Sequence, residues 1–543
     1  MFDIMKTKII TKQIFFWLIA ATLLTAACTK NPVENPLIRL FKPVVSTDPA
    51  IQGNQITLSW MKITGAVSYT AVISRDTTFQ NVDQTITVGK DTSKVVFANL
   101  LWDQSYRIRL KANGGDPSFD SKFLVIPVRT GRFPTILVTP TTNDLTDYSA
   151  VVRWTNSGAA ATSIKVSKTD GTLVKTVALT SGDITAAYRE IQGLSGRTAY
   201  VITIFSGTVL RGTQNYTTIA SPNFGTATVI DLRSITGRPT LLTDTMTTAP
   251  SGSVFILRRS ESYTCNTSAF PLTKSIKIIC LPGLGNPAQL NYLSEFSISG
   301  AIDSIKFKDV SITGFKSDGT SKITYMMNSG SASCNVGIVS FENCSVRAFN
   351  NAIVRLQSGS APWGIINKVY VNNCIISDIG VLGGYGIFHV ANGSANGNKI
   401  NIFEMSKTTC YNFSKGILVN SMANSASVLV ESCTFNDMIT PNNYFMNFGI
   451  YTVASVNINN CIFGKTKDLL LSKGFNASTS TTVLTNNCYS TFDYYTVPLN
   501  SFSGLNPLSL LSTDLFTDPL NGVFTFKTTS FPGKTSSGDP RWR

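Results

Sequence analysis

Three residues in the second half of the chain have side chains suited to proton transfer beside a carboxylate. Arg355 and His389 occupy the same place in two similar segments, residues 353–356 and 387–390, and Tyr385 lies in a glycine-rich stretch just before the second. An arginine can neutralise a carboxylate, and a histidine or tyrosine can exchange a proton. All three are therefore candidate catalytic residues. The alternative is structural, with Arg355 and His389 capping coils or turned inward.

The segments around these residues belong to a repeated pattern. From about Val229, a phrase of β-branched residues, a polar turn and a cysteine recurs, and successive cysteines are 23 to 36 residues apart. This is the length of one coil of a parallel β-helix. Stacked coils place equivalent residues about 4.8 Å apart, so the cysteines should form an inward ladder of small apolar side chains. The ladder is expected to contain Cys344, Cys374, Cys410, Cys433, Cys461 and Cys488.

An asparagine precedes several of these cysteines, and asparagine tolerates the left-handed backbone of a tight turn. We therefore predict an asparagine ladder beside the cysteine ladder, and we assign both to structure. Aligning the strands that precede the cysteine phrases also predicts that one residue of each strand stacks in a column. That column is expected to contain Met326, Arg355, His389, Val419 and Thr452.

The first part of the chain contains a different repeat. Trp60 and Trp154 are 94 residues apart, and so are Tyr106 and Tyr200, each of which follows a leucine by six residues. A constant offset between several landmarks indicates a duplicated module. We predict that these tryptophans and tyrosines are core residues without a binding role.

The tryptophan and the leucine-to-tyrosine spacing resemble fibronectin type III modules, in which the tyrosine forms a corner near a strand start. The resemblance implies two β-sandwiches, over residues 38–131 and 132–226. It further implies that they act as spacers that lift the C-terminal part away from a membrane.

The N-terminus has the features of an export signal. Residues 1–27 contain a basic start and an apolar run from Ile14 to Ala27, which is too short to span a bilayer. Small residues precede Cys28, which resembles a bacterial lipobox, so we expect Cys28 to be lipidated and residues 28–37 to form a tether. The alternative is a plain cleaved signal with an incidental cysteine.

Composition narrows the partners. The 543-residue chain has a formal net charge of +15, but its basic residues are scattered, without the clusters of nucleic-acid-binding arms. An exported basic protein favours anionic polymers such as uronate-rich polysaccharides. Nine of the ten cysteines lie between Cys265 and Cys488, and none has zinc-type spacing, so we expect no metal centre.

The chain ends in residues 538–542, Gly-Asp-Pro-Arg-Trp. Lipobox, paired modules, Asn-Cys coils and this ending together resemble a family of Bacteroidetes lipoproteins of unknown function from polysaccharide-utilisation systems. The resemblance implies an all-β fold: two fibronectin type III-like sandwiches, then a right-handed, pectate-lyase-like parallel β-helix over residues 227–543. It also implies an outer-membrane or cell-surface location beside other glycan-utilisation proteins, and it carries no catalytic residues.

Two functions remain open from the sequence. The first is a surface lipoprotein whose β-helix binds polysaccharide. The second is a lyase that cleaves an acidic glycan by β-elimination, with calcium as a cofactor only in that case. The chain contains no Asp-Asp pair of the kind a hydrolase of this fold uses and no Arg-x-Pro-x-x-Arg pattern of pectate lyases, and Asp378 and Asp437 lie two coils apart. These absences favour binding slightly, and an adhesin without a glycan role is a minor third reading.

Overall fold

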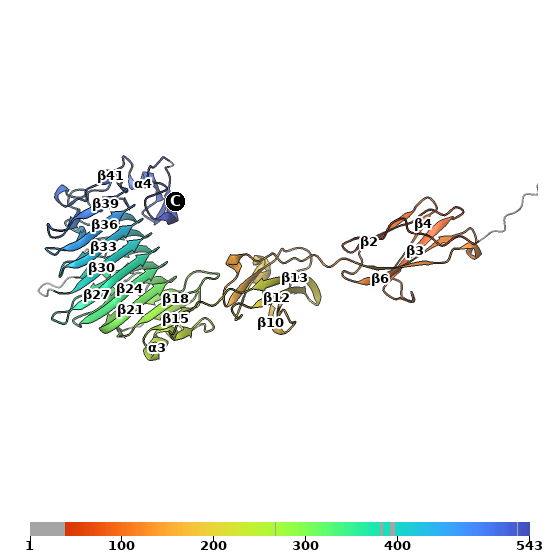
Figure 1. Ribbon diagram of the computed structural model, residues 1–543, viewed down its shortest axis with the longest axis horizontal. Coiled ribbons are helices and arrows are strands. Elements are labelled where there is room, and N and C mark those ends of the chain that lie inside the picture. Colours follow the sequence, from red (N-terminus) through yellow and green to blue (C-terminus); the bar gives the residue numbers. More distant parts are fainter. Residues whose placement is uncertain (1–38, 266–267, 381–383, 391–396, 529) are drawn as a thin grey trace, which may run out of the picture.

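The computed structural model describes residues 39–543 apart from 266–267, 381–383, 391–396 and 529. Two β-sandwiches precede a large parallel β-helix, and the three bodies follow one another along the long axis of the molecule (Figure 1). The predicted all-β fold class is confirmed. The predicted signal peptide, the lipidation site Cys28 and the tether lie outside the described residues. In the described part of the chain, no helix is both long and apolar enough to cross a bilayer.

The first sandwich packs a three-stranded sheet on a four-stranded sheet. Its strands are β1 (Ala50–Gln52), β2 (Gln55–Ser59) and β5 (Lys94–Phe97), facing β4 (Gln84–Gly89), β3 (Ser68–Ser74), β6 (Ser105–Asn113) and β7 (Leu124–Arg129). Residues alternate between buried and partly exposed along β6, as a strand with one face on a core requires. Trp60 is 2% exposed, and its ring centroid lies 5.2 Å from that of Tyr69.

The second sandwich has the same plan. Its strands are β8 (Ser149–Arg153) and β11 (Tyr188–Gln192), facing β10 (Leu173–Ala178), β9 (Ser163–Lys168), β12 (Ala199–Ser206) and β13 (Val209–Thr217), with a short helix α2 (Ser181–Ala186). Trp154 is again buried. The Tyr106 hydroxyl accepts a hydrogen bond from the Leu101 N–H at 2.9 Å, and the Tyr200 hydroxyl accepts one from the Ser195 N–H at 2.9 Å. Both modules therefore contain the tyrosine corner expected from the repeat.

An ion pair joins the second sandwich to the β-helix. The Arg233 guanidinium, just after the first β-helix strand, binds the carboxylates of Asp147 at 2.9 Å and Asp231 at 2.7 Å. It also lies over the Tyr148 ring, with 4.4 Å from Cζ to the ring centroid. Because Asp147 and Arg233 are mostly buried, this contact fixes the approach of the sandwich to the helix more firmly than an exposed pair does.

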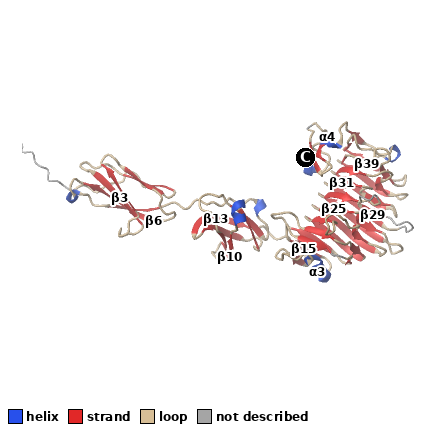
Figure 2. Cartoon of the chain, turned by 180° about the vertical axis from the view of Figure 1, so that it is seen from behind, coloured by secondary structure: helices blue, strands red, loops and turns tan. Residues whose placement is uncertain are grey.

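Three parallel sheets form the walls of the β-helix (Figures 1 and 2). Sheet 1 consists of β14 (Val229–Asp231), β15 (Ser253–Leu257), β18 (Ile276–Cys280), β21 (Gly300–Lys308), β24 (Cys334–Glu342), β27 (Gly364–Asn372), β30 (Lys399–Ser406), β33 (Ser425–Glu431), β36 (Val453–Asn459) and β39 (Val483–Asn486). Sheet 2 consists of β16 (Ser262–Cys265), β19 (Gln289–Tyr292), β22 (Ser311–Thr313), β25 (Ser345–Phe349), β28 (Ile375–Ile379), β31 (Thr409–Phe413), β34 (Thr434–Met438), β37 (Ile462–Phe463), β40 (Cys488–Ser490) and β41 (Leu505–Pro507). Sheet 3 consists of β17 (Phe270–Leu272), β20 (Phe296–Ile298), β23 (Tyr325–Asn328), β26 (Ala352–Leu356), β29 (Phe388–Val390), β32 (Leu418–Asn420), β35 (Tyr444–Asn447) and β38 (Lys473–Asn476).

Left-handed residues make the turn from sheet 1 to sheet 2. Asn343, Asn373, Asn460 and Asn487 have φ angles of 52° to 55°. The Asn373 amide donates to the Asn343 side-chain oxygen at 2.7 Å, and the Asn487 amide donates to that of Asn460 at 2.8 Å. The asparagine ladder is thus present, with side-chain bonds running from coil to coil.

One member of the expected cysteine ladder is wrong. Lys407 makes the left-handed turn in its coil, so Thr408 and not Cys410 follows the turn. The Cys374 N–H donates to the Thr408 hydroxyl at 3.2 Å, whereas Cys410 lies inside β31, opposite Ile376. Thr408 therefore takes the ladder position in this coil. Aligning the coils on their cysteines selects Cys410 instead, which lies two residues too far along the chain.

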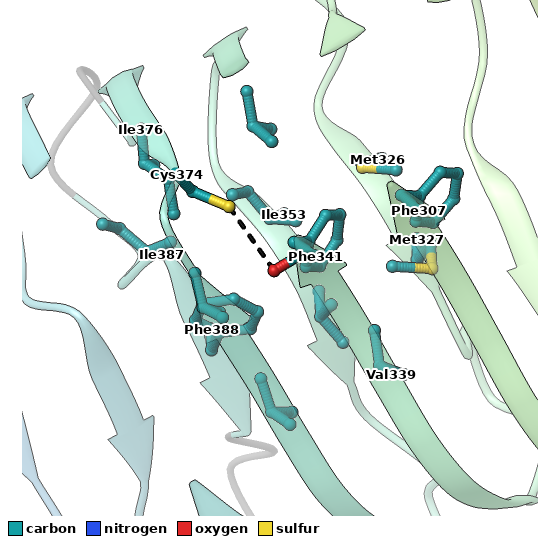
Figure 3. Packing of buried hydrophobic residues seen from close by; sticks show 14 of the residues in the cluster. Phe307, Met326, Met327, Val339, Phe341, Ile353, Cys374, Ile376, Ile387 and Phe388 are labelled. Atoms are coloured by element: carbon teal, nitrogen blue, oxygen red, sulfur yellow. Dashed lines mark hydrogen bonds between the residues drawn. The ribbon is translucent and has the colours of Figure 1, made fainter. Parts of the chain in front are cut away.

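Buried aromatic and aliphatic side chains fill the β-helix. Figure 3 shows Phe307 and Phe341 on adjacent coils, and their rings stack with centroids 5.3 Å apart. In the same figure the Cys374 sulfur points at the Phe341 carbonyl oxygen, 3.4 Å away. The nine cysteines of the described residues are all buried and unpaired, including Cys344, Cys433 and Cys461. Each large apolar side chain buried this way contributes about 1.5–3 kcal/mol to folding.

The two ends of the β-helix are covered differently. Helix α3 (Leu241–Thr248) packs beside β16 in the first coil. At the other end, α4 (Ser512–Leu515) and the hairpin of β42 (Phe516–Asp518) and β43 (Val523–Phe526) fold back over sheet 2. The Phe524 ring packs on Tyr411 of β31, with centroids 5.7 Å apart.

The Gly-Asp-Pro-Arg-Trp ending completes this cover. The Asp539 carboxylate is 1% exposed and accepts a bond from the Thr409 hydroxyl at 2.8 Å. The Arg541 guanidinium donates to the backbone and side-chain oxygens of Asn373 at 2.7 and 2.6 Å. The Trp542 indole N–H donates to the Thr409 hydroxyl at 2.7 Å. The motif is therefore a clasp that ties the C-terminus to the asparagine turns.

Candidate functional site

The outward column of sheet 3 contains the predicted Arg355 and His389. Arg355 of β26 is the register partner of His389 of β29, and His389 is that of Val419 of β32. These three members of the expected column are adjacent. Its two ends are wrong, because Asn328 and Asn447 occupy the places expected for Met326 and Thr452.

The corrections have local causes. Met326 is fully buried, since β23 and β26 pair through Met327 and Val354, which puts Asn328 beside Arg355. Thr452 lies beyond β35, in the turn toward sheet 1, where its hydroxyl lies 3.0 Å from that of Ser480. Loops of unequal length between coils shift such positions, and a sequence alignment of short strands does not detect the shift.

Two tyrosines hold the Arg355 guanidinium. Its Nη1 donates to the Tyr325 hydroxyl at 2.6 Å, and its Cζ lies 5.1 Å from the Tyr325 ring centroid and 5.0 Å from that of Tyr385. The two rings meet edge to face, with centroids 5.6 Å apart. Cation–π contacts and the hydrogen bond fix the guanidinium in one orientation. Arg355 is only partly buried, but its Nε is covered and has no hydrogen-bond partner among the described residues.

His389 is buried against the loop that carries Tyr385. The side chain is 4% exposed, its Nδ1 accepts a bond from the Gly386 N–H at 3.2 Å, and its ring centroid lies 4.6 Å from that of Tyr385. Burial, together with the positive charges of Lys415 and Arg355, lowers the pKa of His389 to about 3. The imidazole is therefore neutral near pH 7, with its proton on Nε2 because Nδ1 is an acceptor.

Lys415 is a fourth member of the site that the sequence analysis missed. Its ammonium donates to the Gly384 carbonyl oxygen at 3.2 Å, which places it against the loop that carries Tyr385. Burial lowers the pKa of Lys415, and the nearby Tyr385 partly opposes that effect. The signal was present in the sequence, because Lys415-Gly416-Ile417 repeats the pattern of Tyr385-Gly386-Ile387 one coil later.

Tyr325 is the fifth member and was also missed. Burial and a hydrogen bond with Tyr385 raise its pKa to about 12, so the phenol stays protonated. The Asn351 amide donates to its hydroxyl at 3.0 Å. Tyr325 therefore positions Arg355 and is a poor base.

Positive charge at this site is not compensated. Among the described residues neither Arg355 nor Lys415 has a carboxylate within ion-pair distance, whereas Lys322 pairs with Asp378 and Lys467 with Asp437, each at 2.7 Å. Asp378 and Asp437 are the candidate calcium ligands of the sequence, and each forms an ion pair with a lysine. In the described part of the chain no group of three acidic, histidine or cysteine side chains suits a metal ion. Asp378 and Asp437, each bound by a lysine, therefore do not fit a calcium ion.

Two solved structures with fibronectin type III domains are similar to about a third of this chain. A two-domain fibronectin type III segment of chicken tenascin matches with 17% identity over 33% of this chain and 97% of its own length, at a TM-score of 0.21. The FN1–FN3 domains of chicken CNTN1 match with 16% identity over 33% of this chain and 67% of theirs, at 0.15. These scores are too low to carry weight, so the fibronectin type III-like assignment rests on the strand pairing and tyrosine corners described above.

No curated protein matches the chain. One family model matches, over residues 428–542, and it describes a domain of unknown function, DUF5123. The matched region begins in β33 and runs through the last coils, the hairpin over sheet 2 and the clasp up to Trp542. The C-terminal end of this β-helix is thus similar to a DUF5123 domain.

Proposed function

We propose that the protein binds an acidic polysaccharide through sheet 3 of the β-helix. The observation that carries the proposal is a pair of cations, Arg355 and Lys415, that have no carboxylate partner among the described residues. The Arg355 guanidinium lies against the rings of Tyr325 and Tyr385, and the Lys415 ammonium lies against the loop that carries Tyr385. A uronate carboxylate would supply the missing negative charge, and a guanidinium can bind it through two parallel hydrogen bonds.

Preorganisation supports this role. Because the two tyrosines already hold the Arg355 guanidinium, less conformational entropy is lost when a ligand binds. The ring of Tyr385, which is only partly buried, also has an apolar face and a polar tip, which suits contact with a sugar ring. The neutral, buried His389 supports the loop that carries Tyr385 without adding charge to the site.

The proposed cellular location of this site rests on the N-terminal sequence and the family resemblance. We propose that export and lipidation at Cys28 place the protein at the outer membrane or cell surface, with the two sandwiches as spacers between the anchor and the pectate-lyase-like β-helix. The family resemblance supports partners among other glycan-utilisation proteins.

A lyase is the second candidate, and one observation favours it. Burial lowers the pKa of Lys415, and a lysine with a lowered pKa can act as a general base. In such a reaction Lys415 takes the proton α to the uronate carboxylate, Arg355 neutralises that carboxylate, and the Tyr385 hydroxyl protonates the leaving oxygen as the carbon–oxygen bond breaks. His389, with a pKa of about 3, is a weaker base than the sequence suggested.

One experiment separates the two functions. The purified protein is incubated with polygalacturonate, and ultraviolet absorbance of unsaturated products is followed alongside migration in a native gel that contains the polymer. Retarded migration with flat absorbance supports binding. A rise in absorbance that Lys415→Gln abolishes supports the lyase. Normal migration with flat absorbance for a panel of acidic polysaccharides contradicts both.

A further inference from the structure

A group of three lysines lies on the outer face of sheet 1, in the first coils of the helix. Lys277 of β18 is the register partner of Lys306 of β21, and Lys308 lies two residues farther along β21. Their neighbours Ile278 and Phe307 are buried in the core, so strand alternation turns the lysines outward. Figure 1 shows β18 and β21 as adjacent strands near the N-terminal end of the helix.

The three ammonium groups are not neutralised. In the described residues none of them has an ion pair, although Lys368 of the same sheet pairs with Glu404 at 2.7 Å. Glu342 is the register partner of Lys308, but it lies beyond ion-pair distance. Lys277 and Lys306 are adjacent by register, and burial and the charges of Lys306 and Lys308 lower the pKa of Lys277, an effect that the Glu342 carboxylate partly opposes. Like charges on neighbouring strands destabilise a sheet.

Lys277 and Lys306 begin a row of register partners that continues along the helix axis with other polar side chains. After Lys277 and Lys306, the next register partners are Ser340 and Tyr370. Ser340 is 1% exposed, and its hydroxyl has no hydrogen-bond partner in the described part of the chain. At the other end of the row, the Lys277 ammonium lies 5.1 Å from the Phe224 ring centroid. The row therefore consists of the ammonium groups of Lys277 and Lys306, the Ser340 hydroxyl and the Tyr370 phenol, one on each successive coil.

We propose that this row is a second binding site for an acidic polysaccharide, in which lysines bind successive carboxylate or sulfate groups. The choice of ligand class rests on the proposed function, whereas the site is on a different sheet. Successive positions are about 4.8 Å apart, so the row suits charges repeated along an extended polymer better than a single anion.

A membrane surface fits the row less well. Among the described residues between Val229 and Ile450, no large apolar side chain is exposed, so nothing beside the lysines would enter a bilayer. The row is also a single file, whereas a bilayer would contact a broad surface.

The experiment uses the purified full-length protein, with polygalacturonate or dextran sulfate as the anionic probe and neutral dextran as the blank. Lys277→Gln/Lys306→Gln/Lys308→Gln is compared with Lys399→Gln, a matched control on β30 of the same sheet. The triple variant and the control are each made twice, once in the wild-type chain and once in a chain that already carries Arg355→Gln and Lys415→Gln. Circular dichroism checks that each variant is folded.

In the chain that carries Arg355→Gln and Lys415→Gln, we expect residual binding of the probe that weakens as salt is added. The triple lysine variant should weaken this residual binding by about tenfold, since each exposed ion pair contributes about 0.5 kcal/mol. The Lys399→Gln control should leave it unchanged. Unchanged residual binding in the triple variant overturns the second site while leaving sheet 3 untouched. If the Arg355→Gln/Lys415→Gln chain, with its three lysines intact, no longer binds the probe, the second site is also ruled out. If the triple variant loses only its affinity for phosphatidylglycerol vesicles, the row faces a membrane and the proposal is wrong.

Discussion

Arg355 and His389 are register partners on adjacent coils, yet their side chains have different partners. The Arg355 guanidinium donates to the Tyr325 hydroxyl at 2.6 Å, whereas His389 Nδ1 accepts from the Gly386 backbone at 3.2 Å. The arginine is thus held toward Tyr325 and Tyr385 without an ion-pair partner in the described part of the chain, and the histidine supports the loop that carries Tyr385. This division of roles determines what substitution of each residue should do.

His389 should make folding stability depend on pH. Its native pKa of about 3 lies below the ordinary value of 6.5, so between these values the unfolded chain binds a proton that the native protein does not. Stability should therefore fall as pH drops from 6.5, by up to about 1.4 kcal/mol per unit, and be unaffected by this group above 6.5. Denaturant unfolding of wild type and His389→Gln at pH 7.5, 6.0 and 5.0 measures the effect. A stability difference that is the same at all three values contradicts the prediction.

Tyr325 should act through Arg355. Tyr325→Phe keeps the ring but removes the hydroxyl that accepts bonds from Arg355 and Asn351. We expect affinity for a uronate trimer to fall by about three- to tenfold, equivalent to the loss of about 0.5–1.5 kcal/mol. Tyr188→Phe, at an exposed position of the second sandwich, is the control for hydroxyl loss and should leave the affinity unchanged. Equal affinity of wild type and Tyr325→Phe for a uronate trimer would show that the hydroxyl does not position the guanidinium.

The C-terminal clasp should stabilise the helix. Arg541→Ala removes charged hydrogen bonds to the oxygens of Asn373 and one to the Cys374 carbonyl. Loss of such bonds should lower the free energy of unfolding by about 1.5–3 kcal/mol. Lys534→Ala, in the same segment, is the matched control and should change little. Identical melting curves for Arg541→Ala and the control would show that the contacts of Arg541 do not stabilise the β-helix.

The cysteines should be unreactive in the folded protein. All nine in the described residues are buried, and burial raises the thiol pKa of members such as Cys265, Cys410 and Cys461. Because the thiolate is the reactive form, iodoacetamide should label none of the nine in native protein and all nine in denaturant. Mass spectrometry reads the result. Labelling of any of them without unfolding is the contrary outcome.

Much of this architecture could be predicted from the sequence because stacked coils repeat their chemistry. The asparagines at the turn and the cysteines beside them mark each coil, and the paired tryptophans and tyrosines mark the two sandwiches. Prediction failed where one coil departs from the pattern. Thr408 stands where a cysteine was expected, and loop lengths shift Met326 and Thr452 out of the column.

The site was only half predictable. Arg355 and His389 were found because their residue types are unusual on apolar strands, and Tyr385 because it lies in the glycine-rich stretch just before His389. Lys415 and Tyr325 were missed because their roles depend on contacts between coils, such as the bond of Lys415 to Gly384. Whether a charge is paired also depends on side-chain positions, which a strand pattern does not specify.

The central claim is that the unpaired cations of sheet 3 bind acidic sugars, and calorimetric titration with a short uronate oligomer tests it most directly. Arg355→Gln should weaken binding by roughly ten- to a hundredfold, as the loss of a charged hydrogen-bonded pair predicts, and Lys415→Gln should weaken it further. Arg107→Gln, on an exposed position of the first sandwich, should have no effect. Wild-type affinity in the Arg355→Gln/Lys415→Gln double variant would contradict the account.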